Sequence, residues 1–193
     1  MTEKNLIVLL DCGDTIIDEG TEIRDERDVV LSGDVLPGAD AMVKGLVSAG
    51  YRVALVADGR FASFENLLSQ HGLFELFETA ICSEQIRASK PSPRMFRAAL
   101  GALDLSPEDA SRCVMVGNNL SRDIVGANRL GITSIHMAWT DRYPRVPADA
   151  EHVPDHTITM PDQLLPLLDR LEAQLSASDA PAAPDAPLTA AAR

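Results

Sequence analysis

The sequence predicts an α/β protein built on a doubly wound parallel sheet. Short, continuously apolar segments alternate with segments whose apolar residues recur every three or four positions, which is the pattern of buried parallel strands and amphipathic helices. Gly and Pro mark most boundaries between the two kinds of segment. The chain has 193 residues, of which 46% are hydrophobic, and this length fits one domain with a sizeable core rather than two large domains.

Five apolar segments and one short segment after them are predicted to form the sheet. The first, residues 5–10, is continuously apolar after Asn5, as expected of a strand that is covered on both faces. The remaining strands are predicted at residues 52–56, 79–82, 113–116, 133–137 and 157–159.

The segments between these strands have the apolar periodicity of helices. Pro37 is placed to begin the first helix, whose apolar residues 39, 42, 43, 46 and 47 share one stripe, and Gly50 is placed to end it. Later helices are predicted at residues 61–70, 93–103 and 121–130, followed by a leucine-rich helix ending at residue 175. Pro166 should kink or delay this last helix. Ser106 and Asp109 predict a capping box for a single helical turn.

Two regions do not follow the alternation. Residues 16–34 are charged and lack a clean period, so we expect an exposed flap there. Residues 176–193 are rich in Ala and Pro and cannot repay the entropy of ordering, so we expect a disordered tail. The folded domain is therefore predicted to span residues 1–175.

Composition excludes several classes of function. Lysine and arginine number 17 against 29 acidic residues, and the net charge of −12 would repel a phosphate backbone, so we expect no nucleic-acid partner. Cys12, Cys82 and Cys113 form neither a disulfide framework nor a zinc set, which fits a reducing cytoplasm. The apolar run at residues 6–10 is too short for a signal peptide, and no stretch approaches the roughly 20 apolar residues that cross a bilayer. We expect a cytoplasmic protein without a membrane partner.

Most of the conspicuous polar residues follow the predicted strands, at the edge where doubly wound sheets bind ligands. The sequences after the first four strands include Asp11-Cys12-Gly13-Asp14-Thr15, Ala57-Asp58-Gly59-Arg60, Ser89-Lys90-Pro91 and Gly117-Asn118-Asn119-Leu120-Ser121-Arg122-Asp123.

These motifs, in this order, resemble the haloacid dehalogenase (HAD) superfamily of Rossmann-like hydrolases, most of which are phosphatases. The resemblance covers residues 5–175 and extends to Leu36-Pro37-Gly38-Ala39 and His71-Gly72-Leu73-Phe74, which carry no catalytic residue. Only about 20 residues separate the first motif from Leu36, so the chain is similar to capless or minimal-cap members. Such a site is open to a large phosphorylated substrate or is closed by another subunit of a homo-oligomer.

The resemblance implies a role for each motif. Asp11 would be the nucleophile, and Lys90 the cation that clamps the substrate. The expected ligands of Mg²⁺ are Asp11, the carbonyl of Gly13, Asn118 and Asp123, and the expected phosphate-binding residues are Ala57, Asp58, Gly59 and Lys90. Asp123 could instead only orient Lys90 or cap a helix, and both roles could hold together.

The chemistry explains why these residue types are needed together. A carboxylate that attacks phosphorus forms an aspartyl-phosphate and splits one hard displacement into two easier steps. Because the attack brings anions together, it requires neutralisation by Mg²⁺ and a lysine.

Three positions depart from the family pattern. Gly13 stands where the phosphatases of the family have an aspartate that protonates the leaving group and then activates water, a contribution worth about 10²- to 10⁴-fold in rate. Asp14 lies one residue further on, but the resemblance does not transfer the role to it. Ala57 replaces a phosphate-binding hydroxyl residue, and Asn118 replaces a carboxylate that faces the metal.

The leading hypothesis is therefore a HAD-like hydrolase that cleaves phosphomonoesters with Mg²⁺ through Asp11, with low or specialised activity. Two alternatives stay open at this point. One is a non-catalytic binding or regulatory protein that keeps the fold, and the other is a metal-free hydrolase of the dehalogenase type.

Overall fold

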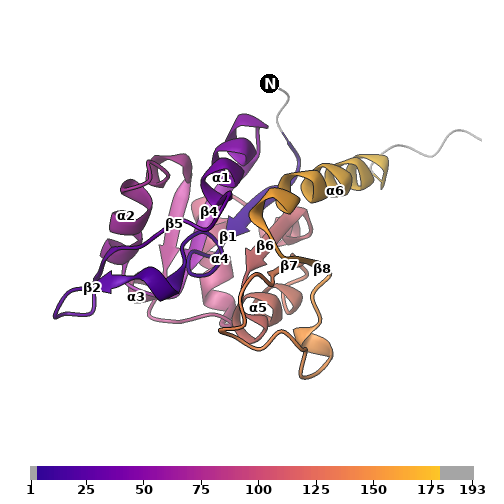
Figure 1. Ribbon diagram of the computed structural model, residues 1–193. Helices are drawn as coiled ribbons and strands as arrows, with labels where there is room; N and C mark the ends of the chain where they lie inside the picture. The colour runs from indigo at the N-terminus through magenta and orange to yellow at the C-terminus, as the bar shows by residue number, and fades with distance from the viewer. Residues whose placement is uncertain (1–3, 179–193) are drawn as a thin grey trace, which may run out of the picture.

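The computed structural model describes residues 4–178 and contains a six-stranded sheet with helices on both faces (Figure 1). Every neighbouring pair of strands in this sheet is parallel. The strands, in the spatial order β5-β4-β1-β6-β7-β8, are β5 Thr79–Cys82, β4 Arg52–Ala57, β1 Ile7–Leu10, β6 Cys113–Gly117, β7 Thr133–Met137 and β8 His156–Ile158. The predicted doubly wound α/β fold is confirmed.

Side chains of the sheet alternate between two apolar layers. On one face, Val8 and Leu10 pack in the layer that includes helices α1, α2 and α6, and on the other, Ile7 and Leu9 pack in the layer that includes α4 and α5. The helices are α1 Ala39–Ser48, α2 Phe61–Ser69, α3 Ser83–Ile86, α4 Pro93–Ala102, α5 Val125–Asn128 and α6 Leu164–Ser178. Both faces of the sheet are covered, which explains the continuous apolar runs of the central strands.

The central strand β1 fixes the position of the site. Leu10 lies opposite Leu55 of β4 on one side and Val116 of β6 on the other. The three strands therefore end at the same edge of the sheet, and the loops that follow them converge there.

Residues 16–34 were predicted to form an exposed flap, and this prediction is wrong for the part of the flap that packs on the core. Ile16, Ile17 and Val30 are buried, and the segment forms a 3₁₀ turn at Glu19–Thr21 and a small antiparallel hairpin of β2 Ile23–Arg24 and β3 Val30–Ser32. The hairpin is tied to α2, because the backbone N–H of Val30 donates to Oγ of Ser63 at 3.0 Å and the Asn66 side chain donates to the carbonyl of Val30 at 2.9 Å. The flap is thus part of the packed structure.

Several local predictions need correction. The segment predicted as one helix at residues 121–130 begins with a π-helical turn, Leu120–Ile124, before α5, and the short helix α3 was not predicted. Pro166 does not delay α6, which begins at Leu164, because in the first helical turn its missing N–H would have no partner in the helix. The last helix continues to Ser178, into the expected tail, and residues 179–193 lie outside the described residues. Within residues 4–178, no helix combines the length and apolar character required to span a bilayer.

Candidate active site

Asp11 lies at the carboxyl edge of the sheet, directly after β1. Its backbone N–H donates to the carbonyl of Val116 at 2.9 Å, which extends the pairing of β1 with β6 by one residue. The residue is 9% exposed and lines a cavity at this edge. The structure therefore presents the candidate nucleophile to a space where a substrate can bind.

Lys90 contacts two of the predicted site carboxylates at once. Its Nζ lies 2.7 Å from Oδ1 of Asp11 and 2.7 Å from Oδ1 of Asp123, and it donates to the carbonyl of Val56 at 2.8 Å. The two carboxylates form ion pairs with the amine, and the carbonyl accepts its hydrogen bond. Burial opposes the charge on this amine, but the carboxylates of Asp11 and Asp123 outweigh that effect and raise the pKa of Lys90. The site therefore contains a fixed cation beside the candidate nucleophile.

Asp123 lies behind Lys90 and does not line the cavity. It is fully buried in the π-helical turn, and its Oδ2 accepts a hydrogen bond from the backbone N–H of Asn119 at 3.0 Å. A Cβ at Gly117 would overlap the Asp123 carboxyl, so this position has room for nothing larger than glycine. These contacts favour the role of orienting Lys90, and none of them supports the predicted role of Asp123 as a metal ligand.

Residues 57–59, at and after the end of β4, contact the apolar core, Lys90 and Ser83. Ala57 is fully buried, because its side chain points into the apolar core, and it does not line the cavity. Asp58 and Gly59 do line the cavity. However, Oδ1 of Asp58 accepts from the backbone N–H of Lys90 at 3.0 Å, and the Gly59 N–H donates to Oγ of Ser83 at 2.9 Å. This loop holds Lys90 in place, and the Ala57 side chain cannot reach a bound phosphate.

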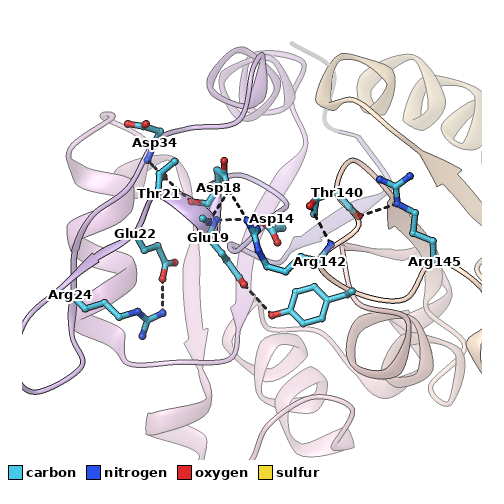
Figure 2. A network of polar contacts seen from close by, with 12 residues as sticks. Asp14, Asp18, Glu19, Thr21, Glu22, Arg24, Asp34, Thr140, Arg142 and Arg145 are labelled. Carbon is cyan, nitrogen blue, oxygen red and sulfur yellow. Dashed lines mark hydrogen bonds and ion pairs between the residues drawn. The ribbon is translucent and has the colours of Figure 1, made fainter.

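A polar network joins the flap to the loop after β7 (Figure 2). Arg142, from that loop, pairs with Asp14 and lies 3.2 Å from Oδ1 of Asp18. Asp14 is fully buried in a left-handed conformation, and its Oδ1 also accepts from the backbone N–H of Glu19 at 3.1 Å. Asp14 thus serves the network through Oδ1 and does not line the cavity that Asp11 lines.

Glu19 extends from this network into the cavity beside Gly13. A Cβ built on Gly13 would overlap Oε1 of Glu19, so the flap carboxylate fills the space that a side chain at position 13 would need. The other oxygen, Oε2, accepts a hydrogen bond from the Tyr143 hydroxyl at 3.0 Å. Burial raises the pKa of Glu19, with a further contribution from the charge of Asp14.

Comparison with known proteins is consistent with this geometry. A family model described as haloacid dehalogenase-like hydrolase matches residues 3–131. The chain belongs to the haloacid dehalogenase-like hydrolases. It is 30% identical over 138 residues to a glyceraldehyde 3-phosphate phosphatase of Methanopyrus kandleri, a match that covers 72% of this chain and 56% of that protein.

Two further proteins that are similar to this HAD-like chain are also named as phosphatases. A phosphoserine phosphatase of Thermus thermophilus is 34% identical over 119 residues, covering 62% of this chain and 45% of the relative. The crystal structure of a HAD phosphatase from Thermococcus onnurineus superposes with a TM-score of 0.68 at 20% identity, covering 84% of this chain and 97% of that one. The chain spans about half the length of the two phosphatases matched by sequence, and the structural likeness shows the shared fold.

The HAD-like site has a donor set that fits a loosely held Mg²⁺. Within residues 4–178, no three His, Cys, Asp or Glu side chains come together as a metal cluster. Asp11 and the Asn118 amide nevertheless line one cavity, and Mg²⁺ is commonly held by one or two carboxylates together with water and substrate phosphate. Asn118 is only 5% exposed, and its Nδ2 makes no hydrogen bond in the described part of the chain. This amide would hold the ion through Oδ1, since Nδ2 carries only donor hydrogens.

Electrostatics also favour a second cation. Asp11 and Asp123 carry two carboxylates against the single amine of Lys90. Burial raises the pKa of Asp11, Lys90 lowers it, and the charge of Asp123 raises it again. Asp11 and Asn118 would hold the cation, and Gly13, which lines the same cavity, remains a predicted carbonyl ligand.

Sequence reasoning identified the residues on the sheet edge and missed those on the flap. Asp11, Lys90 and Asp123 come together as expected from the motifs. Glu19, Arg142 and Tyr143 were not predicted to belong to the site. A signal for Glu19 exists in hindsight, since a glycine two residues after the nucleophile leaves space that another side chain must fill. Nothing in the pattern indicated the loop after β7.

Proposed function

We propose that this HAD-like hydrolase cleaves phosphomonoesters through an aspartyl-phosphate on Asp11. A carboxylate oxygen of Asp11 attacks phosphorus, the bond from phosphorus to the ester oxygen breaks, and the alcohol leaves with a proton. Water then attacks the aspartyl-phosphate, loses a proton, and releases inorganic phosphate with the Asp11 carboxylate restored. The observation that carries the proposal is the position of Lys90, 2.7 Å from Asp11 in the buried side of the site.

Lys90 serves this reaction in two ways. It holds the Asp11 carboxylate in one orientation, since the amine is itself fixed by Asp123 and the carbonyl of Val56. It also places a positive charge where the charge of the phosphoryl group develops, and such preorganised charges are the main source of catalysis in phosphoryl transfer.

Mg²⁺ is part of the proposal, held by Asp11 and Asn118. When bound, the ion would neutralise phosphate oxygens and so reduce the repulsion between two anions. Because the protein supplies one carboxylate and one amide, we expect weak binding of the metal. The names of the phosphatase relatives support a phosphorylated substrate, and the cavity includes Arg60 and Arg122, which can attract a second anionic group of that substrate.

The test measures release of inorganic phosphate from a panel of esters that includes p-nitrophenyl phosphate, glycerol 3-phosphate, phosphoserine and glyceraldehyde 3-phosphate. We expect turnover that requires Mg²⁺, stops with EDTA and is abolished by Asp11→Asn. Asp104→Asn is the matched control, because Asp104 is exposed, lies at the far end of α4 and has a left-handed backbone conformation that asparagine tolerates.

Other outcomes would contradict the proposal in recognisable ways. Phosphate release that is equal in Asp11→Asn and in the control would exclude Asp11 as the nucleophile. Asp11-dependent hydrolysis of a haloacid that is unaffected by EDTA would support the dehalogenase type of chemistry. Binding of phosphate esters without any turnover would identify a binding protein.

A further inference from the structure

We propose that Glu19, supplied by the flap, is the catalytic residue that transfers protons in this site. The inference rests on the proposed phosphomonoester hydrolysis and deepens it by naming a group that the motifs do not contain. It is carried by the position of the Glu19 carboxylate, which fills the space beside Gly13 and faces the cavity that Asp11 lines.

The glycine at position 13 is explained by space and not by backbone conformation. Gly13 is not among the glycines with positive φ, so its backbone would accept an L-amino acid. In the observed conformation the space of a Cβ at this position is occupied by the Glu19 carboxyl, so a side chain there would require Glu19 to move. The nucleophile loop, residues 11–15, therefore has no side chain at position 13, and the flap supplies a carboxylate to the same space.

The reaction needs a group that first donates and then accepts a proton. Cleavage of an alkyl phosphate produces an alkoxide, which leaves readily only as the alcohol, and the water that attacks the aspartyl-phosphate must lose a proton. In the proposed cycle, the Glu19 carboxyl gives its proton to the leaving oxygen. The resulting carboxylate then takes a proton from the attacking water, which restores the starting state.

The other acids that line the cavity are occupied differently. Glu22 and Asp28 both pair with Arg24 on the hairpin. Asp58 binds the backbone N–H of Lys90. Glu19 makes one side-chain hydrogen bond, from Tyr143 to Oε2, and within residues 4–178 its Oε1 has no hydrogen-bond partner.

The Tyr143 hydroxyl gives Glu19 a defined orientation. It donates to Oε2 and leaves Oε1, the oxygen next to Gly13, to face the nucleophile loop. We assign Tyr143 a positioning role, because its contact is to Glu19. The surrounding pairs of Arg142 with Asp14 and Asp18 hold the turn that carries Glu19 (Figure 2).

The decisive experiment compares two substrates that differ in their need for a proton. In Glu19→Gln, kcat/KM for glycerol 3-phosphate should fall about 10²- to 10⁴-fold, the usual contribution of a general acid. For p-nitrophenyl phosphate, whose leaving group departs without help, the fall in kcat/KM should be at least tenfold smaller. With this aryl ester, the variant should also release a burst of p-nitrophenol and accumulate the aspartyl-phosphate, because the second step lacks its base.

The matched control is Glu26→Gln, the same chemical change in the same flap, at an exposed residue that does not line the cavity. Equal losses on both substrates, or a Glu19→Gln variant as active as the control, would overturn the proposal. Failure of the underlying function is distinguishable, because it would show as phosphate release that survives Asp11→Asn or as no release by the wild-type protein.

A second test moves the carboxylate from position 19 to position 13. It compares several variants, so it does not depend on one variant folding well. Glu19→Ala should be inactive on glycerol 3-phosphate, and Gly13→Asp alone should be impaired because the new side chain collides with Glu19. The combination of Gly13→Asp with Glu19→Ala should regain at least tenfold over Glu19→Ala, because a carboxylate returns to the same space from the other side. A double variant no better than Glu19→Ala would contradict the assignment.

Discussion

The hydroxyl of Tyr143 donates a hydrogen bond to Oε2 of Glu19 at 3.0 Å, although the two residues are 124 positions apart in the chain. Tyr143 comes from the loop after β7, and Glu19 lies on the flap that follows the nucleophile loop. The contact therefore links the loop after β7 to the flap residue that lies beside Gly13. Removing this hydrogen bond should lower the activity that depends on Asp11 without any change in the residues of the sheet edge.

Tyr143→Phe should lower kcat/KM for glycerol 3-phosphate by about fivefold, the scale expected for one hydrogen bond that contributes about 1 kcal/mol. The loss should vanish in a Glu19→Gln background, because the hydroxyl acts through Glu19, and a double-mutant cycle measures this coupling. Additive losses would show that Tyr143 contacts the substrate independently.

Arg142→Gln should loosen the flap while the sheet stays intact. The change removes the pairs with Asp14 and Asp18, and it leaves the buried Asp14 carboxylate without its cation. Hydrogen exchange followed by mass spectrometry should show faster exchange at residues 17–24 and unchanged exchange in β1 and β6. Arg97→Gln, a change at an exposed residue of α4, is the control, and equal exchange in both variants would contradict the role of the network.

Lys90→Met should destabilise the protein as well as inactivate it. The variant leaves two buried carboxylates, Asp11 and Asp123, without their shared cation, and breaking a buried pair in this way costs about 3–5 kcal/mol. Urea unfolding measures the loss. Lys44→Met is the comparison, since Lys44 forms an exposed pair with Asp40, and its loss should stay below about 1 kcal/mol. Similar losses in the two variants would show that the cluster contributes little to stability.

Stability should fall as the pH drops below the ordinary pKa of histidine, and His136 should account for part of the fall. Burial lowers the pKa of His136 from its usual 6.5, although the carbonyl of Asn118, which lies 3.1 Å from Nε2, opposes this effect. Below pH 6.5 the unfolded chain binds a proton that folded His136 resists, so the unfolded state gains stability. The stability lost in this way increases with the difference between the pKa of His136 in the folded and in the unfolded chain.

Urea unfolding at pH values about one above and about one below the ordinary pKa of histidine tests this dependence. His136→Gln should lose less stability over this interval than the wild-type protein. An equal loss would assign the dependence to other groups.

The sequence was informative where periodicity and motif coincide. Apolar runs predicted all six strands of the sheet, and the residues after them predicted the meeting of Asp11 and Lys90. The structure of the flap could not be predicted in this way, because it depends on contacts with α2 and with Arg142 and not on a periodic pattern of apolar residues within the flap. The same limit explains Ala57, whose place in a motif indicated phosphate binding but whose position at the end of a buried strand turns it into the core.

The placement of β1 between β4 and β6 has a consequence for how the protein is made. When residues 1–112 have been synthesised, Asp11 and Lys90 are present. Strand β6, which pairs with β1, and Asp123, which pairs with Lys90, have not yet been made. Tyr143 emerges later still. A partly synthesised chain thus contains Asp11 without the residues that surround it in the folded protein, and the candidate site can be complete only after residue 143 has been made.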